Sequence, residues 1–300
     1  MEFGHLHDVS RIDFRLPADD PRSLRALGGA RRLDAHARIG MPIWTQKAWI
    51  GHVYPKGTPA KEFLREYGLQ FDTIELNSTH YGVPDSDGIH RWRDAVPPAF
   101  RFCPKVLQEI SHGMDSPETP RKLEAFYAAM LEFGPKLGMG FMQLPPQFAP
   151  DRLPWLKRLF TLCPPPLKLA LEFRHPDWFE SGRLIEPAFD LMASLGLSSV
   201  ITDVSGRRDV SHSTLTTPDL VVRFIGNAPH ESDGPRLEDW AERLERWFGQ
   251  GLRELHFFVH QRDNVLSPEA ASEFVKKTRG TLPGLRDWTR RDVENQLALL

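Results

Sequence analysis

The chain has 300 residues, of which 26% are charged and 40% hydrophobic, and its formal net charge is −2. These values are typical of a globular protein and exclude a general electrostatic attraction to nucleic acid or anionic membranes, although a local basic patch stays open. Cys103 and Cys163 are too few for a disulfide scaffold and favour a reducing cytosol. No apolar run approaches the roughly 20 residues of a membrane-spanning helix, and the polar N-terminus lacks the apolar centre of a signal peptide. We therefore expect a cytoplasmic protein without a membrane partner.

Residues 1–37 are charged and irregular, with two prolines and the pair Gly28-Gly29. Their arginines allow a DNA-binding tail, but the aspartates of the same segment offset that charge. We predict a solvated N-terminal extension that is helical in part.

From residue 38 onward the chain repeats one order, in which a short apolar strand is followed by a polar loop and a helix. The predicted strands are Arg38–Ile43, Thr73–Asn77, Arg101–Lys105, Gly140–Leu144, Lys168–Phe173, Ser199–Asp203, Leu220–Phe224 and Glu254–His260. The predicted helices are Pro59–Tyr67, Gly88–Asp94, Pro120–Gly134, Pro154–Leu162, Leu184–Leu195, Leu237–Phe248 and Pro268–Thr278.

Eight strands that alternate with helices predict a single-domain α/β fold, a (β/α)8 TIM barrel over residues 38–288. An open, doubly wound sheet is the alternative, but the first strand is not followed by the glycine-rich turn of that fold. Residues 289–300 form a C-terminal tail, in which Arg290–Leu300 has the pattern of a short amphipathic helix.

Polar side chains recur at the carboxyl ends of the predicted strands, on the face that the alternation of side chains turns inward. They are Glu75, Asn77, Lys105, Gln143, Glu172, Arg174, Asp203 and Arg223. Active sites of such barrels lie at this end, so we expect these groups to converge around a small polar ligand. A structural salt-bridge plug is the alternative, although buried ion pairs seldom stabilise a fold.

Three segments then carry a resemblance to a known family. Glu75-Leu-Asn-Ser-Thr-His-Tyr81, Gln143-Leu-Pro-Pro146 and Glu172-Phe-Arg-His-Pro-Asp-Trp178 resemble the signature segments of the YecE-like family, also called domain of unknown function 72. The resemblance runs from about residue 39 to residue 288 and implies a (β/α)8 barrel without an established reaction. The chain departs from the family pattern at Gly40–Trp44, His80–Gly82 and His260–Asn264.

Residue types narrow the chemistry of the predicted site. Glu75, Glu172 and Asp203 are the candidate catalytic groups, because carboxyls that face each other across a barrel can act as acid and base. The candidate substrate-binding residues are Trp44, Asn77, Tyr81, Lys105, Gln143, Arg174, His175, Trp178 and Arg223. Their cations suit an anionic ligand, and their aromatic rings and amides suit a sugar-like one. We predict a metal-independent hydrolase or lyase.

Other chemistries stay open at this stage. Glu75, Glu172, Asp203, His175 and His260 are of types that bind divalent metals, which would suit a metal-dependent enzyme of phosphodiesters or nucleic acid, but no close ligand spacing supports a metal site. A further hypothesis is that Lys105 acts as a Schiff-base amine, which would require a lowered pKa. Another hypothesis is a module that binds a metabolite without turnover. No cofactor motif is present, so we predict no cofactor.

Overall fold

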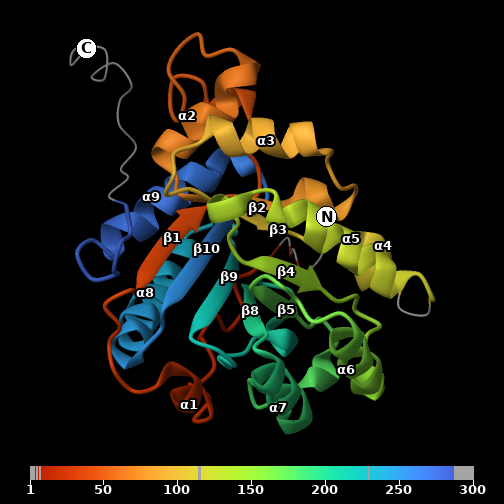
Figure 1. The fold of residues 1–300 in the computed structure, drawn as a ribbon. Helices are drawn as coiled ribbons and strands as arrows, with labels where there is room; N and C mark the ends of the chain where they lie inside the picture. The colour runs from red at the N-terminus through yellow and green to blue at the C-terminus, as the bar shows by residue number, and fades with distance from the viewer. Residues whose placement is uncertain (1–3, 5, 7, 114–115, 229, 287–300) are drawn as a thin grey trace.

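The computed structural model describes residues 4, 6, 8–113, 116–228 and 230–286. Parallel strands occupy the middle of the molecule and helices lie around them (Figure 1). Six strands pair in the order β1-β10-β9-β8-β5-β4, and β2 pairs with β3 in a separate parallel sheet. Their bounds are β1 (His36–Gly40), β2 (Thr73–Leu76), β3 (Arg101–Pro104), β4 (Gly140–Gln143), β5 (Leu169–Glu172), β8 (Ser198–Asp203), β9 (Asp219–Ile225) and β10 (Glu254–His260). The fold is therefore α/β with parallel strands.

All eight strands and all seven helices predicted from the sequence are present, with ends that differ by a few residues. The helices are α2 (Phe63–Gln70), α3 (Ser86–Ala95), α5 (Thr119–Leu131), α6 (Leu153–Leu162), α7 (Glu186–Leu195), α8 (Asp233–Gln250) and α9 (Ser267–Lys277). The partly helical extension that the sequence predicted contains α1 (Ser23–Leu27), for which no bounds were given. The sequence did not predict the short helix α4 (Gln108–Ser111), or the hairpin of β6 (Phe179–Glu180) and β7 (Arg183–Leu184).

The gap between β1 and β2 is crossed by individual contacts and not by a ladder of the described strands. The Glu75 amide donates to the Met41 carbonyl at 3.2 Å, and the Tyr67 hydroxyl bridges the Met41 amide and the Thr73 carbonyl. A Cβ at Gly40 would lie 2.1 Å from the Thr73 oxygen. Glycine thus allows the close approach of the two strands, while a side-chain hydroxyl takes up backbone groups that a ladder would pair.

The gap between β3 and β4 is similar. The Val106 amide donates to the Phe141 carbonyl at 2.8 Å, and the Gly138 amide donates to the Phe102 carbonyl at 2.7 Å. No regular ladder joins these two strands in the described chain, so the pairing defines two parallel sheets, not one closed sheet.

An apolar layer lies between the strands. Its members are Cys103, Met139, Phe141, Ala170, Val200, Val221 and Phe258, all buried. Six of the parallel strands contribute to this layer, and Met139 directly precedes one of them, β4. The layer lies between the carboxyl ends and the amino ends of the strands.

The facing of β8 differs from the prediction. Ala170 of β5 belongs to the inner layer and pairs with Ser198 of β8. Partners in a parallel pair point to the same side, so Ser198 and Thr202 face the interior. The prediction that Asp203 points inward is therefore wrong. Asp203 turns towards the helices, as does Ile201 of the same strand, which joins the outer core.

The segment around α1 packs against the main body. Arg243 of α8 pairs with Asp19 at 3.0 Å, and the Thr214 hydroxyl donates to Asp20 at 2.8 Å. Asp20 and Ser23 are only 1% and 2% exposed. The prediction of a solvated extension is wrong for this part, because the acidic groups of the segment find their partners inside the molecule.

The predicted tail of residues 289–300, with its helix at Arg290–Leu300, lies outside the described residues. Among the helices that are described, none combines the length and the apolar character needed to cross a lipid bilayer.

Candidate functional site

Two glutamates from different strands share one arginine at the carboxyl ends of the sheet. Arg223 of β9 donates from Nε and Nη2 to the two oxygens of Glu75, at 2.9 and 3.0 Å, and from Nη1 to Glu172 Oε2 at 3.1 Å. The glutamates are 0% and 2% exposed, and Arg223 is 7% exposed. The predicted convergence of these three groups is thus present as a buried, hydrogen-bonded cluster.

Glu75 has two further partners. The Asn77 amide donates to its Oε1 at 2.8 Å, and Nε2 of His260 lies 2.9 Å from its Oε2. Burial alone would raise the pKa of Glu75, but Arg223 and His260 hold it well below the usual range. Glu75 is therefore an ionised acceptor, and His260 donates its Nε2–H to it.

Glu172 accepts from Arg174 Nε at 3.0 Å and from Gln143 Nε2 at 2.8 Å. Burial raises the pKa of Glu172, but Arg174 and then Arg223 outweigh that effect and lower it to about 2. Both glutamates are consequently anions at neutral pH, which suits a base or an orienting group and not a proton donor.

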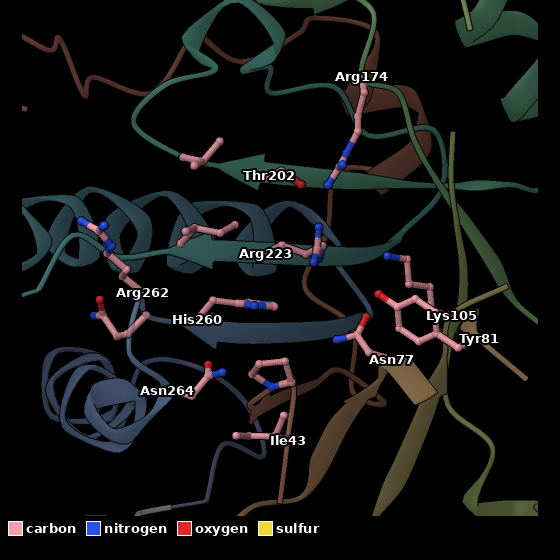
Figure 2. A pocket seen from close by; sticks show the side chains of 14 residues that line it. Ile43, Asn77, Tyr81, Lys105, Arg174, Thr202, Arg223, His260, Arg262 and Asn264 are labelled. Atoms are coloured by element: carbon pink, nitrogen blue, oxygen red, sulfur yellow. The ribbon is translucent and has the colours of Figure 1, made fainter. Parts of the chain in front are cut away.

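An open cavity of about 300 Å³ lies above this cluster. We refer to it as the mouth pocket; its wall includes Lys105, Arg174, Arg223, His260 and Arg262 (Figure 2). Its wall contains four lysine or arginine side chains and no carboxylate of the described chain. The glutamates lie beneath the wall, so the mouth pocket presents positive charge to a ligand.

Five of the predicted substrate-binding residues line the mouth pocket: Asn77, Tyr81, Lys105, Arg174 and Arg223. Gln143 lies below the mouth pocket, between Glu172 and the Lys105 amine. The Lys105 Nζ donates to Gln143 Oε1 at 2.9 Å, and Gln143 Nε2 donates to Glu172. Tyr81 is 70% exposed at the rim.

Asp203 lies outside the mouth pocket, as its position on the helix-facing side of β8 requires. Arg236 Nη2 is 3.1 Å from its Oδ2, Trp240 Nε1 donates to the same oxygen at 3.0 Å, and Arg208 pairs with Oδ1. Burial raises the pKa of Asp203, but Arg236 and Arg208 lower it overall. Asp203 thus ties β8 to α8, away from Glu75 and Glu172.

Three other predicted ligand contacts also lie elsewhere. Trp178 is fully buried and its ring lies 4.4 Å from that of Phe173. Trp44 packs edge-on against Trp92 at 5.5 Å, and His175 accepts from the backbone two residues further on. These side chains pack or cap within the fold and form no part of the mouth pocket wall.

Sequence reasoning missed several residues of the wall, among them Thr202, Arg262 and Asn264. The polar run His260-Gln-Arg-Asp-Asn264 at the end of the last predicted strand was the available signal. It marks a polar loop, but only the structure shows which of its side chains turn to the cavity. Thr202 was missed because Asp203, and therefore the alternate residues of that strand, were predicted to lie on the inward face.

The carboxylate and imidazole groups of the site do not favour a metal centre. Within the described ranges, no three His, Cys, Asp or Glu side chains gather as a metal ion would require. The oxygens of Glu75 and Glu172 already accept from arginine, imidazole and amide groups. A divalent cation would have to displace these donors.

Comparisons with known proteins agree on one family. The family model described as "Protein of unknown function DUF72" matches residues 38–291. The UPF0759 protein YecE of Escherichia coli (strain K12) is 27% identical over 263 residues, which cover 82% of this chain and 93% of YecE. The UPF0759 protein YunF of Bacillus subtilis (strain 168) is 30% identical over 169 residues, 52% of this chain and 58% of YunF.

Solved structures show the same fold. A DUF72 family protein of Enterococcus faecalis V583 superposes with a TM-score of 0.65 at 19% identity, covering 81% of this chain and 95% of that one. One of Thermotoga maritima MSB8 gives 0.60 at 22% identity, covering 80% and 98%. The shared motifs, the family match and the fold together establish that this chain belongs to the DUF72 family.

Proposed function

We propose that the mouth pocket binds a small anionic ligand and that the protein acts on it as a metal-independent acid/base enzyme, a hydrolase or a lyase. The observation that carries this proposal is the uneven charge of the site. Arg174 and Arg223 are offset by the two glutamates beneath them, whereas Lys105 and Arg262 have no carboxylate of the described chain within ion-pair distance. A bound anion would supply the missing charge.

The proposed proton carrier is His260. It lines the mouth pocket and donates to the ionised Glu75, an arrangement that fixes the orientation of the imidazole. Glu172 is assigned to the orientation of Arg174 and Gln143. Asn77 and Tyr81 are placed to contact polar groups of the ligand at the rim.

We also infer that the two parallel sheets together form a (β/α)8 TIM barrel, with the site at the carboxyl ends of its strands. The hydrogen bonds across both gaps and the apolar layer between the strands support this. A cytoplasmic location is proposed because Cys103 and Cys163 are buried free thiols, which suits a reducing compartment.

A thermal-shift titration tests the ligand class. Inorganic phosphate and glucuronate are expected to raise the melting temperature, whereas glucose leaves it unchanged. Arg262→Gln should weaken the effect of both anions about tenfold, while Arg121→Gln, which removes an exposed arginine of α5, keeps it. Equal responses to glucose and glucuronate would contradict the proposal.

The same protein, assayed on a panel of sugar acids and sugar phosphates, tests the reaction class. Turnover that persists in EDTA supports the metal-independent enzyme. Turnover of phosphodiesters only with an added divalent ion would favour the metal-dependent alternative. Binding without any turnover would favour a metabolite-binding module.

A further inference from the structure

The proposed function uses Lys105 only as a positive charge and makes no use of its amine as a nucleophile. Lys105 follows β3 at its carboxyl end, and its side chain is 1% exposed although it forms part of the mouth pocket wall. Figure 2 shows its amine and the Arg223 guanidinium pointing toward one another at the inner end of the pocket. A lysine that only bound an anion electrostatically would gain nothing from such burial, because it loses its own hydration.

The partner of this amine is neutral. Lys105 Nζ donates to Gln143 Oε1 at 2.9 Å. The orientation of that amide is set by its other end, since Gln143 Nε2 donates to Glu172 Oε2 at 2.8 Å. An amide oxygen accepts a hydrogen bond from an ammonium without neutralising it. Glu172 therefore holds an acceptor, and not a counter-ion, against Lys105.

This environment favours the uncharged amine. Burial, and next the positive charge of Arg223, lower the pKa of Lys105 to about 8. About one tenth of the amine is then neutral at pH 7, against roughly one part in three thousand for an ordinary lysine. A neutral amine in a ligand cavity is the form that attacks a carbonyl carbon.

We propose that Lys105 forms an imine with the carbonyl group of a small anionic aldehyde or ketone that binds in the mouth pocket. The inference rests on the proposed function, because Arg174 and Arg262 of the same wall would hold the anionic group of the ligand. It names the substrate class as carbonyl compounds that carry a carboxylate or a phosphate, and it assigns the bond-forming nucleophile.

The chemistry balances without a metal or an oxidant. Lys105 Nζ adds to the carbonyl carbon, and the carbonyl oxygen takes up a proton to give a carbinolamine. The C–O bond then breaks with a second proton transfer, water leaves, and the nitrogen becomes part of a C=N bond. Amine, carbonyl and one proton from solvent thus give a protonated imine and one water. The resulting cation withdraws electrons from the adjacent C–C bond, which is the usual basis of amine-catalysed lyases.

Reductive trapping tests the proposal on the chain of 300 residues. Pyridoxal 5′-phosphate, used here as a phosphorylated aldehyde reagent, and glyoxylate, a carboxylated one, are each added before sodium borohydride, and the modified peptide is identified by mass spectrometry. We expect a single adduct per chain, on Lys105, with at least one of the two reagents. Which reagent reacts faster distinguishes a phosphate from a carboxylate site. Pyridoxal without the phosphate should react at least tenfold more slowly.

Variants and pH separate this reaction from general lysine labelling. Lys105→Met should abolish the adduct, and Lys277→Arg, which alters a lysine paired with Glu238, should leave it unchanged. In the wild type the rate of labelling at Lys105 should level off above about pH 8, whereas surface lysines continue to react faster up to about pH 10. This profile does not depend on how well a variant folds.

Two outcomes overturn the inference in distinguishable ways. If phosphate stabilises both the wild type and Lys105→Met but no adduct forms on Lys105, the pocket binds anions and the imine is wrong. If neither anion binding nor an adduct is found, both the imine and the proposed function are wrong. Labelling spread over surface lysines, with Lys105 no faster than the rest, also contradicts the imine.

Discussion

The two ends of the parallel strands both hold polar cavities, but their charges are arranged differently. At the amino ends lies a cavity of about 520 Å³, here called the floor cavity, whose wall includes Arg38, Lys168, Arg253 and Glu254. Lys168 Nζ lies 2.6 Å from Glu254 Oε2, and Arg253 pairs with the buried Asp219 at 2.5 Å. Arg38 Nε is 3.8 Å from Glu254. Three of the four lysine and arginine side chains on the wall of the floor cavity therefore have a carboxylate within ion-pair distance, and Arg101 is the one for which the described chain shows none.

In the mouth pocket the carboxylates lie beneath the wall instead of on it. Lys105 and Arg262 face the cavity, and neither has a carboxylate of the described chain within ion-pair distance. Under the proposed function, the carboxyl ends of the strands hold a ligand site, whereas the amino ends of the same strands hold a network of ion pairs. Ligands of parallel α/β folds bind at the carboxyl ends, which agrees with this division.

The largest expected effect comes from removing the arginine that both glutamates share. Arg223→Met leaves Glu75 and Glu172 buried with fewer partners, so we expect the free energy of unfolding at pH 7 to fall by about 3–5 kcal/mol. In the floor cavity, Arg253→Met should cost only about 1–2 kcal/mol, because Asp219 keeps Lys168 at 3.1 Å. Denaturant unfolding measures both. Equal losses would mean that the two ends are held together in the same way.

The next effect concerns pH. Glu172 has an ordinary pKa of 4.5 that is lowered in the fold to about 2, so the folded state gains stability from this group above pH 4.5 and loses it as the pH falls towards 2. The full contribution is about 3 kcal/mol, as the size of the shift implies. Glu172→Gln should cost about that amount at pH 7 and little at pH 2.5. Glu118→Gln, on the exposed surface, should leave the pH profile of unfolding unchanged.

If wild type and Glu172→Gln lost stability in parallel between pH 4.5 and 2.5, the ionised state assigned to Glu172 would be wrong.

Much of the fold and of the buried cluster could be predicted from the sequence. The alternation of strands and helices indicated the parallel α/β fold, and the inward facing of Glu75, Glu172 and Arg223 placed them together. The run Ser198–Asp203 is buried on both sides, so it shows no polar alternation from which its facing could be read. The register with β5 decides that facing, and register is a tertiary property. Asp203 was consequently assigned to the wrong side.

The aromatic residues illustrate a second limit. Trp178 follows the polar end of β5 in the sequence, as a ligand platform would, yet its ring packs against Phe173 in the core. Conversely, Arg262 lies in a loop without any periodic pattern, and only the path of that loop brings it to the mouth pocket. Residue type and distance from a strand end do not decide between packing and ligand contact.

A smaller effect, of opposite sign at the two ends, comes from lysine replacements. Lys105→Met removes a buried charge without a counter-ion and leaves one amide oxygen unpaired, so we expect the protein to become about 1–2 kcal/mol more stable at pH 7. Lys168→Met removes a partner of Glu254 and should destabilise by up to about 1 kcal/mol. Denaturant unfolding of both variants measures the signs. A loss of stability in Lys105→Met would show that this lysine serves the fold and not a ligand.

The most direct test of the comparison is to locate a bound anion. Crystals of the full chain soaked in selenate and measured at the selenium absorption edge reveal the positions of the anion without assumptions about the substrate. The account predicts an anomalous peak in the mouth pocket, within hydrogen-bond reach of Lys105 or Arg262, and none in the floor cavity. A peak confined to the floor cavity, or occupied equally at both ends, would contradict it.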